Sequence, residues 1–244
     1  MGYLDNPKIL FAIVSIAMLA GCASKPTQTI ENLKAAATNE LNANATYTAF
    51  AQKAQEEGLK NVSALFQAAA AAESIHAARQ MAVLKSLGVT DFNPQPAAGT
   101  VGTTLENLAT ALNGEQNEST TIYPGFIEIA TKEKADSAQV AFKFAMEAEK
   151  MHATYYQAAL DSLTASMKAA QDAADAAAAK VAAKKDAKKD AKEVAPAAIT
   201  PSDAGVPATW YVCPVCGGLY TAAVEACAIC GVPGAQFMQF PKAE

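Results

Sequence analysis

The stretch AESIHAARQ, residues 72–80, places Glu73 and His76 three positions apart in an alanine-rich segment. A second stretch, AEKMHATYY at residues 148–156, repeats this spacing with Glu149 and His152, and the sequence contains no other histidine. Residues three apart on an α-helix lie about 60° apart around its axis, so each pair can point at one centre. The two motifs therefore predict two helices that face a common site.

The positions of upstream acids indicate an internal duplication. Glu40 precedes Glu73 by 33 residues, and Glu115 precedes Glu149 by 34. Apolar and small residues that recur every three or four positions predict four helices, at residues 29–57, 60–87, 103–130 and 134–166. The segment 89–102 is long enough to cross the length of a bundle. We therefore expect an all-α, ferritin-like four-helix bundle in which two hairpins are joined by one long crossover.

Three local signals set the expected helix ends. Gly88 is suited to the C-terminal cap of the second helix. Thr103 and Glu106 have the spacing of a capping box at the start of the third helix. Pro124 and Gly125 predict a kink or local break within that third helix.

The acids and histidines predict a metal site. Glu118 follows Glu115 by three residues, so five carboxylates and two imidazoles are expected inside the bundle. A solvated ion pair is the alternative for either Glu-x-x-His motif alone, but two matched copies argue against it. Burying several carboxylates without compensation would cost many kcal/mol or force them to protonate, which indicates two bound cations. Carboxylates with two imidazoles suit iron or manganese.

The C-terminal stretch WYVCPVCGGLYTAAVEACAICGVPGAQF, residues 210–237, contains two Cys-x-x-Cys pairs. The cysteines are Cys213, Cys216, Cys227 and Cys230. Four thiolates in a tetrahedral array bind iron or zinc. Two disulfides and a structural zinc ribbon are the alternatives. The clustering of these cysteines favours a metal site, because a disulfide framework is normally spread through the fold.

The N-terminal segment reads as a targeting signal. Residues 1–21 contain a short apolar run, and Leu19, Ala20 and Gly21 precede Cys22, which resembles a bacterial lipoprotein signal. Cleavage would leave a lipid on Cys22. We therefore expect an exported, membrane-anchored protein facing the periplasm. An ordinary secretory signal or an N-terminal membrane helix is the alternative.

Charge and composition argue against binding to nucleic acid and to anionic lipid. The net charge is −5, without a basic patch beside aromatic residues, so no nucleic-acid partner is expected. Residues 166–208 include an alanine, lysine and aspartate tract without a large apolar stripe. This tract predicts a solvated, semi-rigid spacer, and its interleaved acids disfavour binding to anionic lipid.

Taken together, these residues resemble the rubrerythrin family, in which a ferritin-like di-iron domain precedes a rubredoxin-like domain. The resemblance places these domains at 29–165 and 209–244. It implies a non-haem di-iron centre and a rubredoxin-type iron with four cysteine ligands, for which zinc is possible. The implied bundle ligands are Glu40, Glu73, His76, Glu115, Glu118, Glu149 and His152, and the implied rubredoxin ligands are Cys213, Cys216, Cys227 and Cys230.

The resemblance also implies residue roles. Glu118 is the extra carboxylate that rubrerythrins add to a minimal di-iron site, and it would replace His76 on one iron upon oxidation. Tyr47 and Tyr123 match tyrosines near the irons, with ordinary core packing as the alternative. The sequence departs from the family in Asn42 and Asn44, which stand where arginine is frequent, and in its long spacer and lipid signal.

The implied activity is a peroxidase that serves in oxidative stress. It would reduce hydrogen peroxide to water with electrons delivered through the rubredoxin-type centre by an unidentified donor, and homodimers would be typical. One alternative is an iron-binding ferroxidase that uses oxygen. The other is a structural module that carries zinc in both sites.

Overall fold

The computed structural model describes residues 25–185 and 201–241. The predicted signal segment with Cys22 and residues 186–200 of the predicted spacer lie outside these ranges. Within the described part of the chain, every helix is too short or too polar to span a bilayer.

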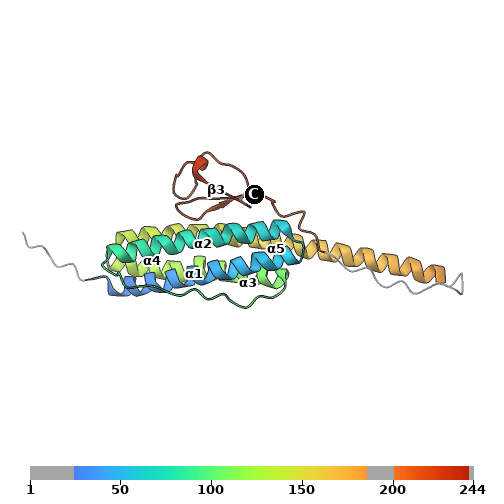
Figure 1. The fold of residues 1–244 in the computed structure, drawn as a ribbon, viewed down its shortest axis with the longest axis horizontal. Helices are drawn as coiled ribbons and strands as arrows, with labels where there is room; N and C mark the ends of the chain where they lie inside the picture. The colour runs from blue at the N-terminus through green and yellow to red at the C-terminus, as the bar shows by residue number, and fades with distance from the viewer. Residues whose placement is uncertain (1–24, 186–200, 242–244) are drawn as a thin grey trace, which may run out of the picture.

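The structure has the expected helical bundle with a long crossover (Figure 1). Helices α1 (Thr27–Glu56) and α2 (Lys60–Ser86) form one antiparallel hairpin. The second hairpin consists of α3 (Thr104–Asn117), the π-helix η1 (Glu118–Ile122), α4 (Tyr123–Lys132) and α5 (Asp136–Lys185). Residues 87–103 join the hairpins as an extended crossover along the bundle.

The helix ends follow the local signals. Gly88 has φ +82° just after α2, and the amide of Val89 donates to the carbonyl of Leu84, as in a Schellman cap. The side chain of Thr103 accepts from the Glu106 amide while Glu106 reaches back to the Thr103 amide. The predicted C-cap and capping box are both confirmed.

The interruption in the third helix lies one turn before the predicted position. The chain stays helical through Pro124, and the irregularity is the π-helix from Glu118 to Ile122. Proline cannot donate to the carbonyl one turn earlier and its ring crowds that carbonyl, so a wider preceding turn accommodates it without a break.

Two apolar clusters fill the bundle on either side of a polar layer. One contains the aromatic group Tyr47, Phe50, Phe66 and Tyr156, with ring centroids 5.4–6.1 Å apart. The other is built around Tyr123, Phe126 and Phe142. Along α1, α2 and α5, the predicted acid and histidine positions fall between these clusters. The apolar packing therefore fixes the helices that carry the polar layer.

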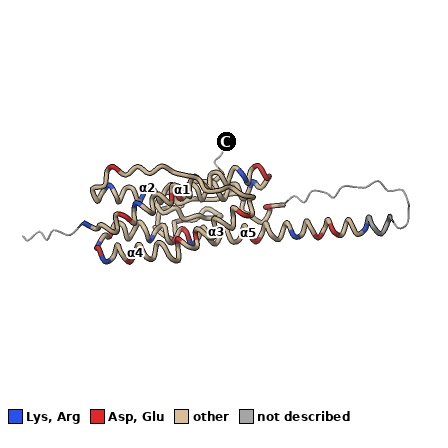
Figure 2. Tube along the Cα trace, turned by 90° about the horizontal axis from the view of Figure 1, so that it is seen from below, with Lys and Arg blue, Asp and Glu red and all other residues tan. Residues whose placement is uncertain are grey.

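Helix α5 is longer than the predicted end at Ser166 and continues to Lys185, projecting beyond the bundle (Figure 1). Alanine and lysine favour the helical backbone even where no apolar stripe can be buried. Acidic and basic residues are interspersed along the projection (Figure 2), and Lys168 pairs with Asp172 at 2.8 Å. The first part of the predicted spacer is thus a solvated helix.

The second domain is a small three-stranded antiparallel sheet. Its strands are β1 (Trp210–Val212), β2 (Leu219–Tyr220) and β3 (Met238–Phe240), in the order β2-β1-β3, with a short 3₁₀ turn at Gly234–Gln236. This domain lies across the α2 side of the bundle (Figure 1). Its strands contribute Trp210, Val212 and Leu219 to the same apolar cluster as α2.

Candidate metal centres

Six of the predicted bundle ligands meet in the polar layer between the two apolar clusters. Each is at most 2% exposed. They come from four helices: Glu40 from α1, Glu73 and His76 from α2, Glu115 from α3, and Glu149 and His152 from α5. The Glu-x-x-His spacing aims both members of each pair inward, as the helical period requires.

These six residues form two overlapping groups. Glu40 and His76 belong to one group, and Glu115 and His152 to the other, while Glu73 and Glu149 belong to both. Within each group the potential ligand atoms lie within 4.8 Å of one another. The geometry thus offers two adjacent cation positions, each with one terminal carboxylate and one imidazole, and two carboxylates able to bridge them.

The second domain fixes which histidine nitrogen faces this centre. The Nε2 of His76 lies 2.9 Å from the carbonyl oxygen of Cys216, and the Nε2 of His152 lies 3.1 Å from that of Gly217. Because a carbonyl can only accept, each Nε2 carries the proton and donates it. The Nδ1 atoms then face the carboxylates, 2.8 and 2.7 Å from the oxygens of Glu149. Both imidazoles therefore present Nδ1 as the ligand atom.

Burial and mutual repulsion shift the acidities of the carboxyl groups. Burial raises the pKa of Glu40 to about 8. Burial and the charges of Glu149 and Glu73 raise the pKa of Glu115 well above its usual value. Burial would also raise the pKa of Glu149, but His76 and His152 outweigh it and hold that pKa far below the usual range.

The donor set fits two divalent cations. One carboxylate oxygen each of Glu40, Glu73 and Glu115 is buried without a hydrogen-bond partner in the described structure, and both oxygens of Glu149 face the Nδ1 atoms of the histidines. Buried groups of this kind are rarely left unsatisfied. Four ionised carboxylates carry four negative charges, which two divalent ions balance, and oxygen with imidazole suits iron.

Glu118 lies beside this centre and belongs to neither of the two four-residue groups. It is partly buried and begins the π-helix η1. Burial, followed by the charge of Glu40, raises its pKa well above the usual value. The role of Glu118 as a metal ligand therefore stays a prediction, and its carboxyl lies on the Glu40 side of the centre.

Both predicted tyrosines hydrogen bond to terminal carboxylates. The hydroxyl of Tyr47 donates to Glu115 at 2.8 Å, and that of Tyr123 donates to Glu40. Each tyrosine thus orients one carboxylate in addition to packing in the core.

Sequence reasoning missed Gln80. Its side-chain nitrogen lies 3.3 Å from Glu40 and 2.9 Å from the hydroxyl of Tyr123, and the residue is fully buried. Its position, one turn after His76 on the same helical face, was the available signal.

Asn42 and Asn44, which stand where arginine is frequent in the family, make hydrogen bonds away from the metal ligands. Asn42 accepts from the Ala97 amide in the crossover, and Asn44 donates to the Ala70 carbonyl on α2.

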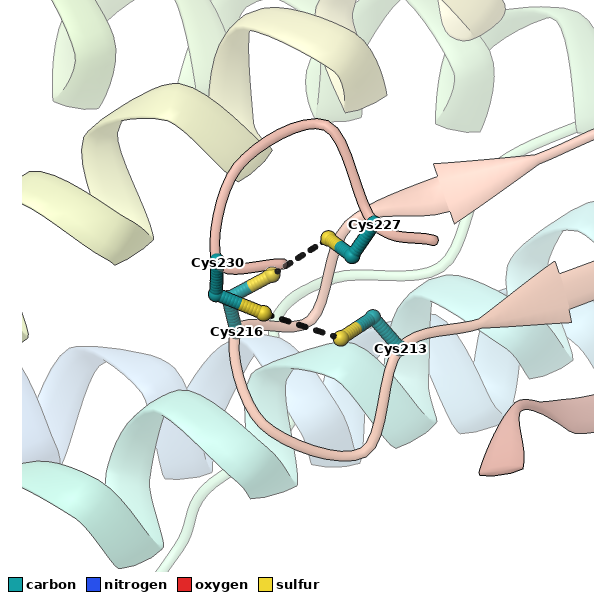
Figure 3. Close-up of side chains that lie close together, drawn as sticks. All are labelled: Cys213, Cys216, Cys227 and Cys230. Atoms are coloured by element: carbon teal, nitrogen blue, oxygen red, sulfur yellow. Dashed lines mark hydrogen bonds between the residues drawn. The ribbon is translucent and has the colours of Figure 1, made fainter. Parts of the chain in front are cut away.

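The four C-terminal cysteines converge from two similar turns (Figure 3). The sulfurs of Cys213 and Cys230 are 3.5 Å apart, and those of Cys216 and Cys227 are 3.3 Å apart. These separations are far too long for disulfides, and tetrahedral ligands at about 2.3 Å from a metal would be about 3.8 Å apart. The arrangement therefore fits a four-sulfur metal site.

Backbone geometry builds each half of this site. Gly217 and Gly231 have φ +74° and +76°, and their amides donate to the carbonyls of Cys213 and Cys227. Hydrogen bonding between two of the thiols lowers the pKa of Cys213 to about 5 and raises that of Cys216. The Cys213 thiolate therefore forms readily, and metal binding would release the protons of the other thiols.

Comparison with known proteins identifies the family to which this architecture belongs. The rubrerythrin family profile matches residues 31–160. The chain belongs to the rubrerythrin family. It is 38% identical to nigerythrin from Nitratidesulfovibrio vulgaris over 61% of this chain and 73% of that protein. It is 31% identical to rubrerythrin-2 from Clostridium acetobutylicum over 88% of this chain and 98% of that protein.

A solved structure of nigerythrin, in its fully reduced, all-ferrous state, aligns with a TM-score of 0.65 at 29% identity. The alignment covers 87% of this chain and 86% of nigerythrin. The ferritin-like fold with a small rubredoxin-like domain is therefore confirmed. In this rubrerythrin-family chain, the carboxylate and histidine groups fit a di-iron centre and the four cysteines fit a rubredoxin-type centre.

Proposed function

We propose that this rubrerythrin-family protein reduces hydrogen peroxide to water in the bundle, with electrons entering through the four-cysteine site. When bound, the iron pair supplies two electrons to the peroxide. Family membership and the buried, acid-rich donor set support the activity. A single observation supports the electron route: both bundle histidines donate hydrogen bonds to the Cys216–Gly217 backbone.

The proposed reaction needs protons as well as electrons. Conversion of one peroxide to two waters consumes two electrons and two protons. Burial and the charges of the neighbouring carboxylates raise the pKa of Glu118 well above its usual value, which favours its protonated form, and Glu118 lies at the edge of the centre. With the metals bound, Glu118 would be positioned to give a proton to a departing oxygen, and its anion would be an alternative ligand to His76.

The tyrosines and Gln80 orient two of the carboxylates. Tyr47 holds Glu115, and Tyr123 with Gln80 holds Glu40. Burial raises the pKa values of the Tyr47 and Tyr123 hydroxyls well above the ordinary range, so both remain protonated donors. Rigid orientation of these carboxylates keeps the centre assembled while its charge changes.

The test is rapid mixing of the anaerobically reduced protein with peroxide and, separately, with oxygen. Fast oxidation by peroxide and slow oxidation by oxygen would support the peroxidase. The reverse order would indicate the ferroxidase alternative, and a native protein that contains zinc alone would indicate the structural module. Mössbauer spectra of iron-loaded protein should show a coupled pair and a separate four-sulfur iron.

The proposal also includes a lipid anchor and a homodimeric assembly. Cys22 carries a lipid that anchors the exported protein to a membrane, as the lipobox-like sequence predicts. The protein forms homodimers, as the family resemblance implies. Radiolabelled palmitate incorporation tests the first statement, and light scattering on the purified protein tests the second.

A further inference from the structure

The start of α2 lacks a cap from its own sequence. Leu59 occupies the N-cap position and makes no side-chain hydrogen bond there. The first amides of a helix have no acceptors within the helix and need partners from outside it. A carboxylate oxygen of Asp203 accepts from the amides of Asn61 at 2.6 Å and Val62 at 3.2 Å. A residue more than 140 positions away thus caps α2.

The contact is reciprocal. The side-chain amide of Asn61 donates to the carbonyl oxygens of Asp203 at 3.1 Å and Val206 at 3.0 Å. The Val206 amide closes a tight turn on the Asp203 carbonyl, and the Val206 side chain is 4% exposed within the apolar cluster of α2. Residues 202–206 are therefore attached to α2 by both polar and apolar contacts.

The same segment also contacts α5. The Ser202 amide donates to the hydroxyl of Ser166 at 2.7 Å. At Gly205, a Cβ atom would lie 2.3 Å from the hydroxyl oxygen of Ser162, so only glycine fits without displacing that side chain. The segment thus bridges α2 and α5, the two helices that carry His76 and His152.

The second domain begins directly after this bridge. Trp210, at the start of β1, packs edge-to-face on Tyr155 of α5 with ring centroids 4.8 Å apart. Cys213 follows β1 immediately, and the Cys216 and Gly217 carbonyls then reach the two histidines. Hydrogen bonds weaken steeply with small displacements, so the segment before β1 is placed to influence the distance between the four-cysteine domain and the bundle.

We propose that residues 202–206 act as a clip that holds the four-cysteine domain over the bundle histidines, with Asp203 as a positioning residue for electron transfer between the two metal sites. The transfer role rests on the proposed function, whereas the clip itself rests only on the contacts above.

The first test measures amide hydrogen exchange at Asn61 and Val62 in zinc-loaded protein, which is redox-silent. Asp203→Ala should speed exchange at these amides about fivefold or more, as expected for loss of a helix N-cap. Asp203→Asn should stay near the parent rate, because an amide oxygen also accepts these bonds. Asp91→Ala removes the same charge from an exposed site in the crossover and should change nothing.

The second test uses iron-loaded, fully reduced protein mixed with one equivalent of peroxide. Oxidation of the bundle should be unchanged in Asp203→Ala, because no ligand is altered. Subsequent oxidation of the four-sulfur iron should slow several-fold in Asp203→Ala and recover in Asp203→Asn.

Unchanged exchange in Asp203→Ala would overturn the clip. Faster exchange with unchanged oxidation of the four-sulfur iron would overturn the positioning role. A parent protein that does not react with peroxide would refute the proposed function, while the exchange measurement would still decide the clip.

Discussion

The two metal sites of this chain are built in opposite ways. The bundle site draws ligands from Glu40 to His152, across four helices, and buries all six almost completely. The cysteine site takes its ligands from two turns within 18 residues, Cys213 to Cys230, and leaves Cys230 partly exposed. One site is thus assembled by packing of the bundle and the other by local backbone turns.

This difference determines what each site requires to hold its shape. The bundle has extensive aromatic clusters on both sides of its ligands, so we expect helix packing to persist without the metal. The second domain has only three strands of two or three residues, and three of its four cysteines are themselves core residues. Small domains with little core depend on bound metal for their folding.

The largest expected effect follows from this dependence. Cys216→Ser should abolish the colour of the rubredoxin-type iron and unfold the second domain, because metal binding contributes about 10 kcal/mol or more to such domains. The bundle should still react once with peroxide, since its ligands lie elsewhere. Visible absorption and single-turnover mixing check both outcomes. Sustained turnover with a donor specific for the rubredoxin-type site would show that electrons enter by another route.

The next prediction concerns the contact between the two sites. In Gly217→Ala, the new Cβ would lie 2.3 Å from the Nε2 of His76, so the second domain must move away. Electron transfer to the bundle should slow by about 10²-fold, as small misplacements can do. Stopped-flow absorption at the four-sulfur iron measures this rate.

Gly231→Ala provides a matched control for that change. Gly231 has nearly the same positive φ, but a Cβ there meets no atom within 4 Å. Similar slowing in both variants would attribute the effect to backbone strain and contradict the role of the close approach.

Glu118 tests whether the bundle site extends beyond the six residues that converge. Glu118→Ala should leave iron binding largely intact, because six ligands remain, but slow oxidation by peroxide about 10²-fold if the carboxyl supplies a proton. The measurement compares stopped-flow rates at equal iron content. Exposed Glu128 on α4 provides a control substitution to alanine. Equal rates for parent and Glu118→Ala would remove Glu118 from the site.

A smaller effect concerns pH. Burial raises the pKa of Glu40 to about 8, so below that value the metal-free carboxyl holds a proton that an incoming cation must displace. Metal affinity of the bundle should therefore rise with pH up to about 8, by up to about tenfold per unit for each proton released. Calorimetry in buffers of different ionisation enthalpy measures the released protons. Affinity that does not change between pH 6 and 8 would contradict this shift.

The smallest effect on either site is expected from Cys22→Ala. This change should release the protein from membranes and leave both metal sites unaltered, because the first helix of the described residues, α1, begins five residues later at Thr27. Fractionation followed by metal analysis checks it. Membrane retention of the variant would indicate an uncleaved hydrophobic anchor.

The sequence alone determined the features that depend on residues a few positions apart. The helical period brought Glu73 to His76 and Glu149 to His152, and the glycine turns brought the cysteines together, because these patterns depend on residues a few positions apart. The capping box at Thr103 and the Gly88 cap were predictable for the same reason.

Tertiary structure alone decided how these pieces meet. Nothing in the local sequence pairs Gln80 with Glu40, fixes the histidine tautomers through Cys216 and Gly217, or caps α2 with Asp203. Tertiary structure also decided that Glu73 and Glu149 belong to both ligand groups and that Glu118 belongs to neither. Glu118 begins the π-helix, which lies one turn before the proline from which a helix interruption was predicted. These features arise from contacts between segments distant in sequence, where packing of the whole bundle sets distances that no local pattern encodes.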